Sequence, residues 1–257
     1  MPTPALIASL LLSGATAPEH PPIPTDRVRE NALAFDGTDD SVTVPACEAM
    51  RYPGTGGWTV EFWVKPVIYP FRAETAIIGQ ESVGVPAHDP WSVRANPTHF
   101  EFRVDGPRGD TGRVLFDLAL GVWQHVACVY RGPGTEGGMS MSVFVDGRLV
   151  SEQAVTVRME SREDPIYFGA LTGTYFRGLI DDARVWARAL NPEGVAGAMG
   201  GDVDPDDPGL RAWWSFDEAS GPVAIDRSSR GTHAVLGRPH DPNDTTRPAR
   251  VGRVPPG

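Results

Sequence analysis

Two adjacent aspartates, Asp181 and Asp182, stand in the middle of "FRGLIDDARVWARAL" (residues 176–190), whose alternating side chains predict a β-strand. Strands are depleted in aspartate, so something has to satisfy this pair. Alternation predicts one face with Leu179, Asp181, Ala183 and Val185, and the opposite face with Ile180, Asp182, Arg184 and Trp186. A carboxylate among apolar side chains must be hydrogen-bonded, paired or bound to a metal. We expect Asp182 to pair with Arg184 and leave these alternatives open for Asp181.

Paired carboxylates for glycoside hydrolysis are not found at a workable spacing. "EFRVD" places Glu101 and Asp105 on one face of a predicted strand, but four residues along a strand separate them by about 13 Å. Glycosidases use separations of about 5 to 9.5 Å. The sequence therefore predicts a protein that is not an enzyme, with a degenerate glycoside hydrolase as a remaining alternative.

Other chemical motifs are incomplete. "GPGTEG" (132–137) has the letters of a dinucleotide fingerprint, but a predicted strand follows it where that motif needs a helix. "DVDPDDPG" (202–209) begins like an EF-hand loop, yet Asp207 occupies its glycine position and Trp213 its closing glutamate position. We interpret the first as a hairpin turn and the second as a solvated acidic linker.

Charge and composition exclude some classes of partner. The 257-residue chain has a formal net charge of −10, which argues against binding to nucleic acid or to an anionic membrane surface and favours cations or neutral ligands. Its two cysteines, Cys47 and Cys128, are too few for a disulfide framework. They either form one bridge or remain free thiols.

The first 28 residues differ in character from the rest. An apolar run over residues 5–12, followed by Ala15-Thr16-Ala17, resembles a secretory signal, although no basic residue precedes the run and Pro18 lies at the expected cleavage point. The run is too short to span a membrane. We expect an apolar segment and proline-rich lead-in over 1–28 and one domain over 29–257. A secreted or surface location is expected, with a cytoplasmic or particle-associated one left open.

Short strands and turns make up most of the remaining chain. Alternating or β-branched runs occur over residues 41–44, 57–67, 99–106, 113–120, 122–132, 140–155, 166–171 and 178–186. Turn residues separate them, in the pattern of a sandwich or barrel. One short helix is expected over 191–201, with Asn191 as its N-cap and Pro192 at its first position. The fold class predicted is all-β.

A family resemblance accounts for these runs together. "ALAFDGTDDSVTVP", "GWTVEFWVKP", "GVWQHVACVYRG", "SVFVDGRLV", "YFGAL" and "FRGLIDDARVWARALNPEGV" follow one another over residues 31–200. This succession resembles the laminin-G-like, or concanavalin A-like, jelly-roll domains. The resemblance implies a two-sheet antiparallel sandwich, with recognition on the concave face and its rim loops. A further segment, 210–237, resembles a flanking piece of these domains, so residues 202–257 are expected to add strands to the same sandwich.

The resemblance also implies a structural calcium ion. In related jelly rolls an aspartate at the position of Asp181 binds calcium together with main-chain carbonyls near the Phe-Asp-Gly segment. This implies Asp181 as a calcium ligand, with Asp36, Gly37 and Asp39 as its neighbours.

For function, the resemblance favours a non-catalytic recognition module that binds a glycan or a protein. A structural or assembly component of a larger surface or particle is the alternative. Trp91 in "HDPWSV" is the candidate for stacking on a sugar, because Asp89 and Pro90 predict a turn there. The oligomeric state is left open.

Overall fold

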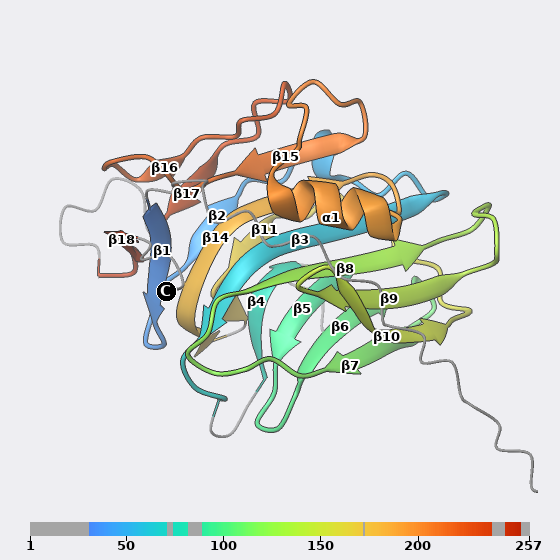
Figure 1. Cartoon of the computed structure of the whole chain (residues 1–257), viewed down its shortest axis with the longest axis horizontal. Helices are drawn as coiled ribbons and strands as arrows, with labels where there is room; N and C mark the ends of the chain where they lie inside the picture. The colour runs from blue at the N-terminus through green and yellow to red at the C-terminus, as the bar shows by residue number, and fades with distance from the viewer. Residues whose placement is uncertain (1–30, 71–73, 82–88, 172, 238–244, 253–257) are drawn as a thin grey trace, which may run out of the picture.

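The computed structural model describes residues 31–70, 74–81, 89–171, 173–237 and 245–252. The predicted signal segment and lead-in, residues 1–28, lie outside the described residues. The described chain forms two antiparallel sheets of eight strands each, packed face to face as a jelly-roll sandwich (Figure 1). The predicted fold class is confirmed.

The first sheet has seven strands in one path and an eighth, β15 (Leu210–Trp214), paired with β14. The path runs β10 (Arg148–Ala154), β9 (Ser140–Val145), β8 (Gln124–Arg131), β3 (Gly57–Pro66), β14 (Arg177–Trp186), β1 (Asn31–Asp36) and β18 (Ala249–Gly252). Its β8–β9 connection is the hairpin expected at residues 132–137.

The second sheet follows one path through eight strands. Its order is β16 (Val223–Ala224), β17 (Ala234–Leu236), β2 (Val42–Val44), β11 (Ile166–Phe168), β4 (Thr75–Gln80), β5 (Trp91–Ala95), β6 (Phe100–Asp105) and β7 (Thr111–Phe116). A small hairpin, β12 (Ala170–Leu171) and β13 (Thr174–Tyr175), and the 3-10 turn η1 (Glu48–Met50) complete the β-rich part.

The main hydrophobic core lies between the sheets. It contains the fully buried aromatic side chains Trp58, Phe62, Phe102 and Trp214, and it also contains Trp91, whose exposure is 0%. Trp91 is the first residue of β5, opposite Gln80 and Val104. The prediction that Trp91 contacts a ligand from a loop is therefore wrong, because the strand begins directly after the Asp-Pro turn and directs this side chain inward.

The C-terminal segment contributes strands to both sheets. β15 and β18 belong to the first sheet, whereas β16 and β17 extend the second. Trp214 and Phe216 from this segment are fully buried in the main core and pack edge-to-face against Phe168. The core is thus built jointly by the segment after residue 202 and the earlier strands.

A short helix, α1 (Pro192–Gly200), covers the outer face of the first sheet (Figure 1). It begins as predicted, because the Asn191 side chain accepts a hydrogen bond from the Gly194 backbone N–H at 2.9 Å and Pro192 follows the cap. Val195 and Ala198 of the helix form a second apolar cluster with Ala127 and Trp186. This helix shields the polar side chains on that face of the sheet from water.

A β-bulge in β14 changes which side chains share a face. The β3–β14 register shifts between Asp181 and Arg184, and Asp182 adopts a left-handed φ of 50°. Ile180, Ala183 and Val185 consequently all reach the inter-sheet core. The expectation that Asp181 shares a face with Ala183 and Val185 is wrong, because strict alternation ignores the extra residue.

The two cysteines do not form a disulfide. Cys47 and Cys128 are free thiols, and Cys128 is buried in the core.

Among the described residues, no helix has the length and apolar character needed to cross a membrane.

Candidate functional site

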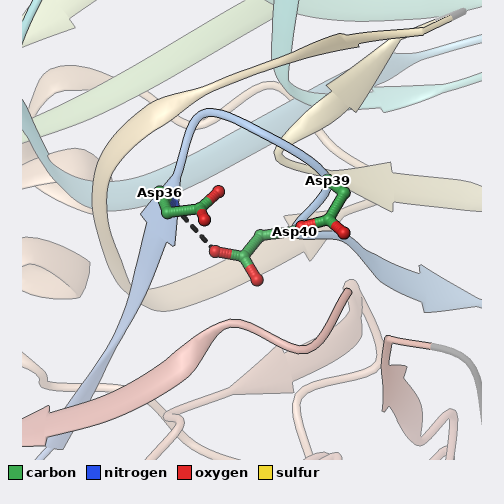
Figure 2. A group of neighbouring side chains, drawn as sticks. All are labelled: Asp36, Asp39 and Asp40. Carbon is green, nitrogen blue, oxygen red and sulfur yellow. Dashed lines mark hydrogen bonds between the residues drawn. The ribbon is translucent and has the colours of Figure 1, made fainter. Parts of the chain in front are cut away.

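Three aspartates converge in the turn that follows β1, which we call the acidic turn (residues 36–40). Asp36, Asp39 and Asp40 each bring one carboxylate oxygen within 4.8 Å of the others (Figure 2). Gly37 makes this close approach possible, because its φ of 83° is a conformation that side chains other than glycine rarely adopt. It is the one group of three or more metal-binding side chains found in the described part of the chain.

Hydrogen bonds fix the three carboxylates in place. The backbone N–H of Asp36 donates to Asp40 Oδ2 at 2.7 Å, the contact dashed in Figure 2. The N–H of Thr38 donates to Asp36 Oδ1 at 2.7 Å, and the Thr245 hydroxyl donates to Asp39 Oδ2 at 2.9 Å. Each of these bonds uses one oxygen of its carboxylate, and the Asp36 and Asp40 side chains also interact with each other.

The acidic turn concentrates negative charge, and among the described residues no basic side chain forms an ion pair with its three carboxylates. Burial, together with the neighbouring charges of Asp36 and Asp39, raises the pKa of Asp40 to about 6, against the lowering effect of its backbone hydrogen bond. Ionising Asp40 therefore adds a carboxylate charge beside those of Asp36 and Asp39. Calcium accepts six to eight hard oxygen ligands, including carboxylates and backbone carbonyls. The donor set of the acidic turn fits such an ion.

The structure brings together only part of the predicted calcium site. Asp36, Gly37 and Asp39 lie in the acidic turn as expected, and Asp40 joins them although it was not foreseen. The grouping with Asp181 is not formed. The β1–β14 register pairs Asp36 with Arg177, so Asp181 is four residues further along β14, or about 13 Å away. Asp181 is fully buried opposite Trp63 of β3.

A hollow of about 640 Å³ adjoins the acidic turn at the rim of the sandwich, and we call it the rim hollow. Asp36 belongs to both features. The segment after β3 contributes Ile68 and Tyr69, and the β13–β14 region contributes Tyr175 and Arg177. Aromatic rings beside carboxylate, hydroxyl and guanidinium groups are typical of a site for a polar ligand with apolar faces. Sequence reasoning missed both tyrosines, because neither belongs to a motif.

The outer face of the first sheet holds a different group of charges, the ion network. Arg184 Nη2 donates to Asp182 Oδ2 at 2.6 Å, which confirms the predicted pair, and Arg184 Nη1 lies 3.3 Å from Glu61 Oε1. His125 Nε2 lies 3.2 Å from Glu61 Oε2. Burial acts to raise the pKa of Glu61, but the His125 hydrogen bond and the Arg184 charge lower it overall. The ion network is buried and paired within the protein, so loss of one partner would leave a buried charge uncompensated.

The second sheet carries charged residues on its outer face as well. Glu101 lies directly opposite Arg94, which also pairs with Glu74 and Asp89. The exposed fraction of Glu101 is 3% and that of Asp105 is 1%. Both carboxylates are therefore covered by neighbouring groups rather than exposed on the sheet surface. This burial raises the pKa of Glu101.

Solved structures share the architecture. A protein from Bacteroides ovatus ATCC 8483 that is proposed to bind carbohydrate matches with a TM-score of 0.62 and 18% sequence identity. The match covers 87% of the present chain and 60% of the Bacteroides protein. The receptor binding domain of botulinum neurotoxin mosaic serotype C/D matches with a TM-score of 0.53 and 16% identity, over 69% of this chain and 43% of that one. At these identities the likeness shows the fold.

Comparison by sequence gives the family. No curated protein shows significant similarity to the chain. The family model of the concanavalin A-like lectin/glucanases superfamily, in its laminin G form, matches residues 36–196, more than half of the chain. The chain therefore belongs to the laminin-G-like group of the concanavalin A-like lectin/glucanases superfamily.

Proposed function

We propose that the protein is a non-catalytic recognition module that binds a glycan in the rim hollow, beside a calcium ion held by the acidic turn. The observation that carries this proposal is the shared position of Asp36, which belongs both to the three-carboxylate cluster and to the lining of an aromatic hollow. The similarity of fold to the Bacteroides ovatus protein proposed to bind carbohydrate supports the choice of a glycan over a protein.

The chemistry of the hollow suits a sugar. Sugar rings present apolar C–H faces, which the rings of Tyr69 and Tyr175 can cover, and hydroxyl edges, which Asp36 and Arg177 can hydrogen-bond. When bound, calcium would neutralise the acidic turn and hold Asp36 in one position. We place the ligand at the rim rather than on the outer face of the second sheet, because Arg94 forms ion pairs with Glu74 and Asp89 on that face.

A calcium-dependent module is suited to a secreted or surface location. Extracellular calcium modules function with affinities of about 10⁻⁴ to 10⁻³ M, which matches a site of few carboxylates completed by backbone and water oxygens. The assembly alternative stays a prediction, since the N-terminal segment that would tether the domain lies outside the described residues.

The test is a glycan array probed with the full chain in about 1 mM calcium and again in EDTA. Tyr69→Ala and Tyr175→Ala should each weaken binding of any glycan hit by about tenfold or more, as expected for the loss of roughly 1.4 kcal/mol. Tyr167→Ala is the matched control, because Tyr167 is half-buried on β11 and does not line the hollow.

Binding that survives both hollow variants, or that Tyr167→Ala abolishes equally, contradicts this placement of the ligand. An array without any glycan hit, combined with capture of a defined protein partner, would favour protein recognition instead. Release of reducing ends from a β-glucan that Glu101→Gln abolishes would restore the hydrolase alternative.

A further inference from the structure

Three arginines line a second hollow, of about 480 Å³, which we call the arginine hollow. Arg51 follows η1, Arg211 lies in β15, and Arg230 lies between β16 and β17. None of the residues that line it belongs to the rim hollow. In a chain with a net charge of −10, a hollow lined by three arginines is an unusual concentration of positive charge.

The arginines are held by groups that do not neutralise them. Arg51 Nε donates to the Ser161 hydroxyl at 3.1 Å, and Arg230 Nη2 donates to the Pro208 carbonyl at 3.0 Å. Arg230 Nε also donates to the Leu210 carbonyl at 3.5 Å, and among the described residues the remaining guanidinium N–H groups of Arg51 and Arg230 have no acceptor. The Nε of Arg211 is shielded from solvent, and no atom within the described ranges accepts its hydrogen. A guanidinium in this state has donors available for an added acceptor.

The electrostatics of the hollow favour an anion. Burial lowers the pKa of Arg211, and the charge of Arg230 lowers it further. Glu48 is the one carboxylate among the lining residues, and it is exposed. In the part of the chain that the structure describes, no ion pair joins Glu48 to Arg51, Arg211 or Arg230. The lining therefore combines three guanidinium groups with one exposed carboxylate and has a net positive charge.

We propose that the arginine hollow binds an oxyanion, a sulfate ester or a uronate carboxylate, carried by an acidic polysaccharide. Guanidinium groups bind such oxyanions through charge-assisted, often bidentate hydrogen bonds. The volume admits a substituted sugar ring. The oxyanion site stands on the geometry of this hollow alone, whereas its assignment to a glycan rests on the proposed function.

The experiment measures binding of the full chain to immobilised dextran sulfate, polygalacturonate and neutral dextran, all in EDTA. EDTA removes the calcium on which binding in the rim hollow depends, so the two proposals fail separately. The variant pair Arg51→Gln with Arg211→Gln removes two charges, and the Arg211 change breaks no hydrogen bond to a described residue. Arg113→Gln with Arg148→Gln, both exposed and outside the hollow, is the control of equal charge.

The proposal predicts binding to one of the two acidic polymers, and the polymer that binds identifies the sulfate or the carboxylate as the ligand group. The hollow pair should weaken that binding at least tenfold, and the control pair less than twofold. If melting shows that the hollow pair is unfolded, Arg51→Gln alone, at an exposed position, gives the same comparison. Equal losses in both pairs, equal binding to neutral dextran, or no binding to either acidic polymer overturns the proposal.

Discussion

The ion network and the acidic turn both concentrate carboxylates, but they balance their charge in opposite ways. In the ion network, Arg184 and His125 lie against Glu61 and Asp182, and side-chain exposure does not exceed 5%. In the acidic turn, three carboxylates meet and their hydrogen bonds come from uncharged donors. A buried charge must be compensated inside the protein, whereas a charge at the rim can be compensated by an ion from solution. The first region therefore stabilises the fold, and the second is suited to binding.

Removing the C-terminal segment should have the largest effect, because this segment contacts both regions. Trp213 Nε1 donates to Asp182 in the ion network, and Thr245 donates to Asp39 in the acidic turn. Deleting residues 210–257 also removes strands from both sheets, so the whole domain should unfold. Circular dichroism melting would check this. An unchanged melting temperature would mean that the segment is an independent appendage.

Breaking the ion network should have the next largest effect. Arg184→Met leaves Glu61 and Asp182 buried without their cation, and the free energy of unfolding should fall by about 3 to 5 kcal/mol in urea denaturation. Arg188→Met is the control. Arg188 pairs with Asp207 but its side chain is 45% exposed, so its loss should cost only about 0 to 1 kcal/mol. Equal stability of the two variants would refute the structural role of the network.

Calcium should stabilise the protein through the acidic turn. A ligand that binds only the folded state at a hundredfold excess over its Kd adds about 2.7 kcal/mol, so EDTA should lower the melting temperature. Asp39→Asn should remove most of this response. Asp181→Asn should lower stability in both conditions but keep the response. Loss of the EDTA effect in Asp181→Asn alone would return the calcium site to Asp181.

The smallest expected effect is a dependence of folding stability on pH, which arises in the acidic turn when calcium is removed. The folded pKa of Asp40, about 6, is above its ordinary value of 3.8. The folded state therefore binds the proton more tightly, and stability in EDTA should fall as the pH rises from about 4 to about 6. Asp40→Asn should flatten this slope. A rise in stability over that interval that depends on Asp40 would contradict the assignment.

Most of the fold could be predicted because strand patterns and caps are local. The Asn191–Pro192 pair specified the start of α1, because the Asn191 side chain accepts a hydrogen bond from the Gly194 backbone N–H only three residues away. The bulge at Asp182 could not be predicted, because it depends on the pairing of β14 with β3. The same bulge answers the question of the adjacent aspartates: Asp182 pairs with Arg184, while Asp181 stays in register with Trp63.

The candidate site was only partly predictable for a related reason. "FDGTDD" indicated an acidic turn, but the family pattern drew attention to Asp181, and only the β1–β14 register shows that these positions are separated. The rim hollow gathers Tyr69 and Tyr175 from segments about 100 residues apart. Trp91 illustrates the opposite error, since a turn signal before a strand does not expose the first strand residue.

The central claim is that the acidic turn is completed by an ion from solution, and calorimetric titration of calcium into the full chain at neutral pH tests it most directly. We predict one calcium bound per chain, an affinity at least tenfold weaker in Asp39→Asn and in Asp40→Asn, and no change in Asp207→Asn, which alters a different acidic turn. A flat titration of the folded protein, or binding that Asp39→Asn and Asp40→Asn leave unchanged, would contradict the claim.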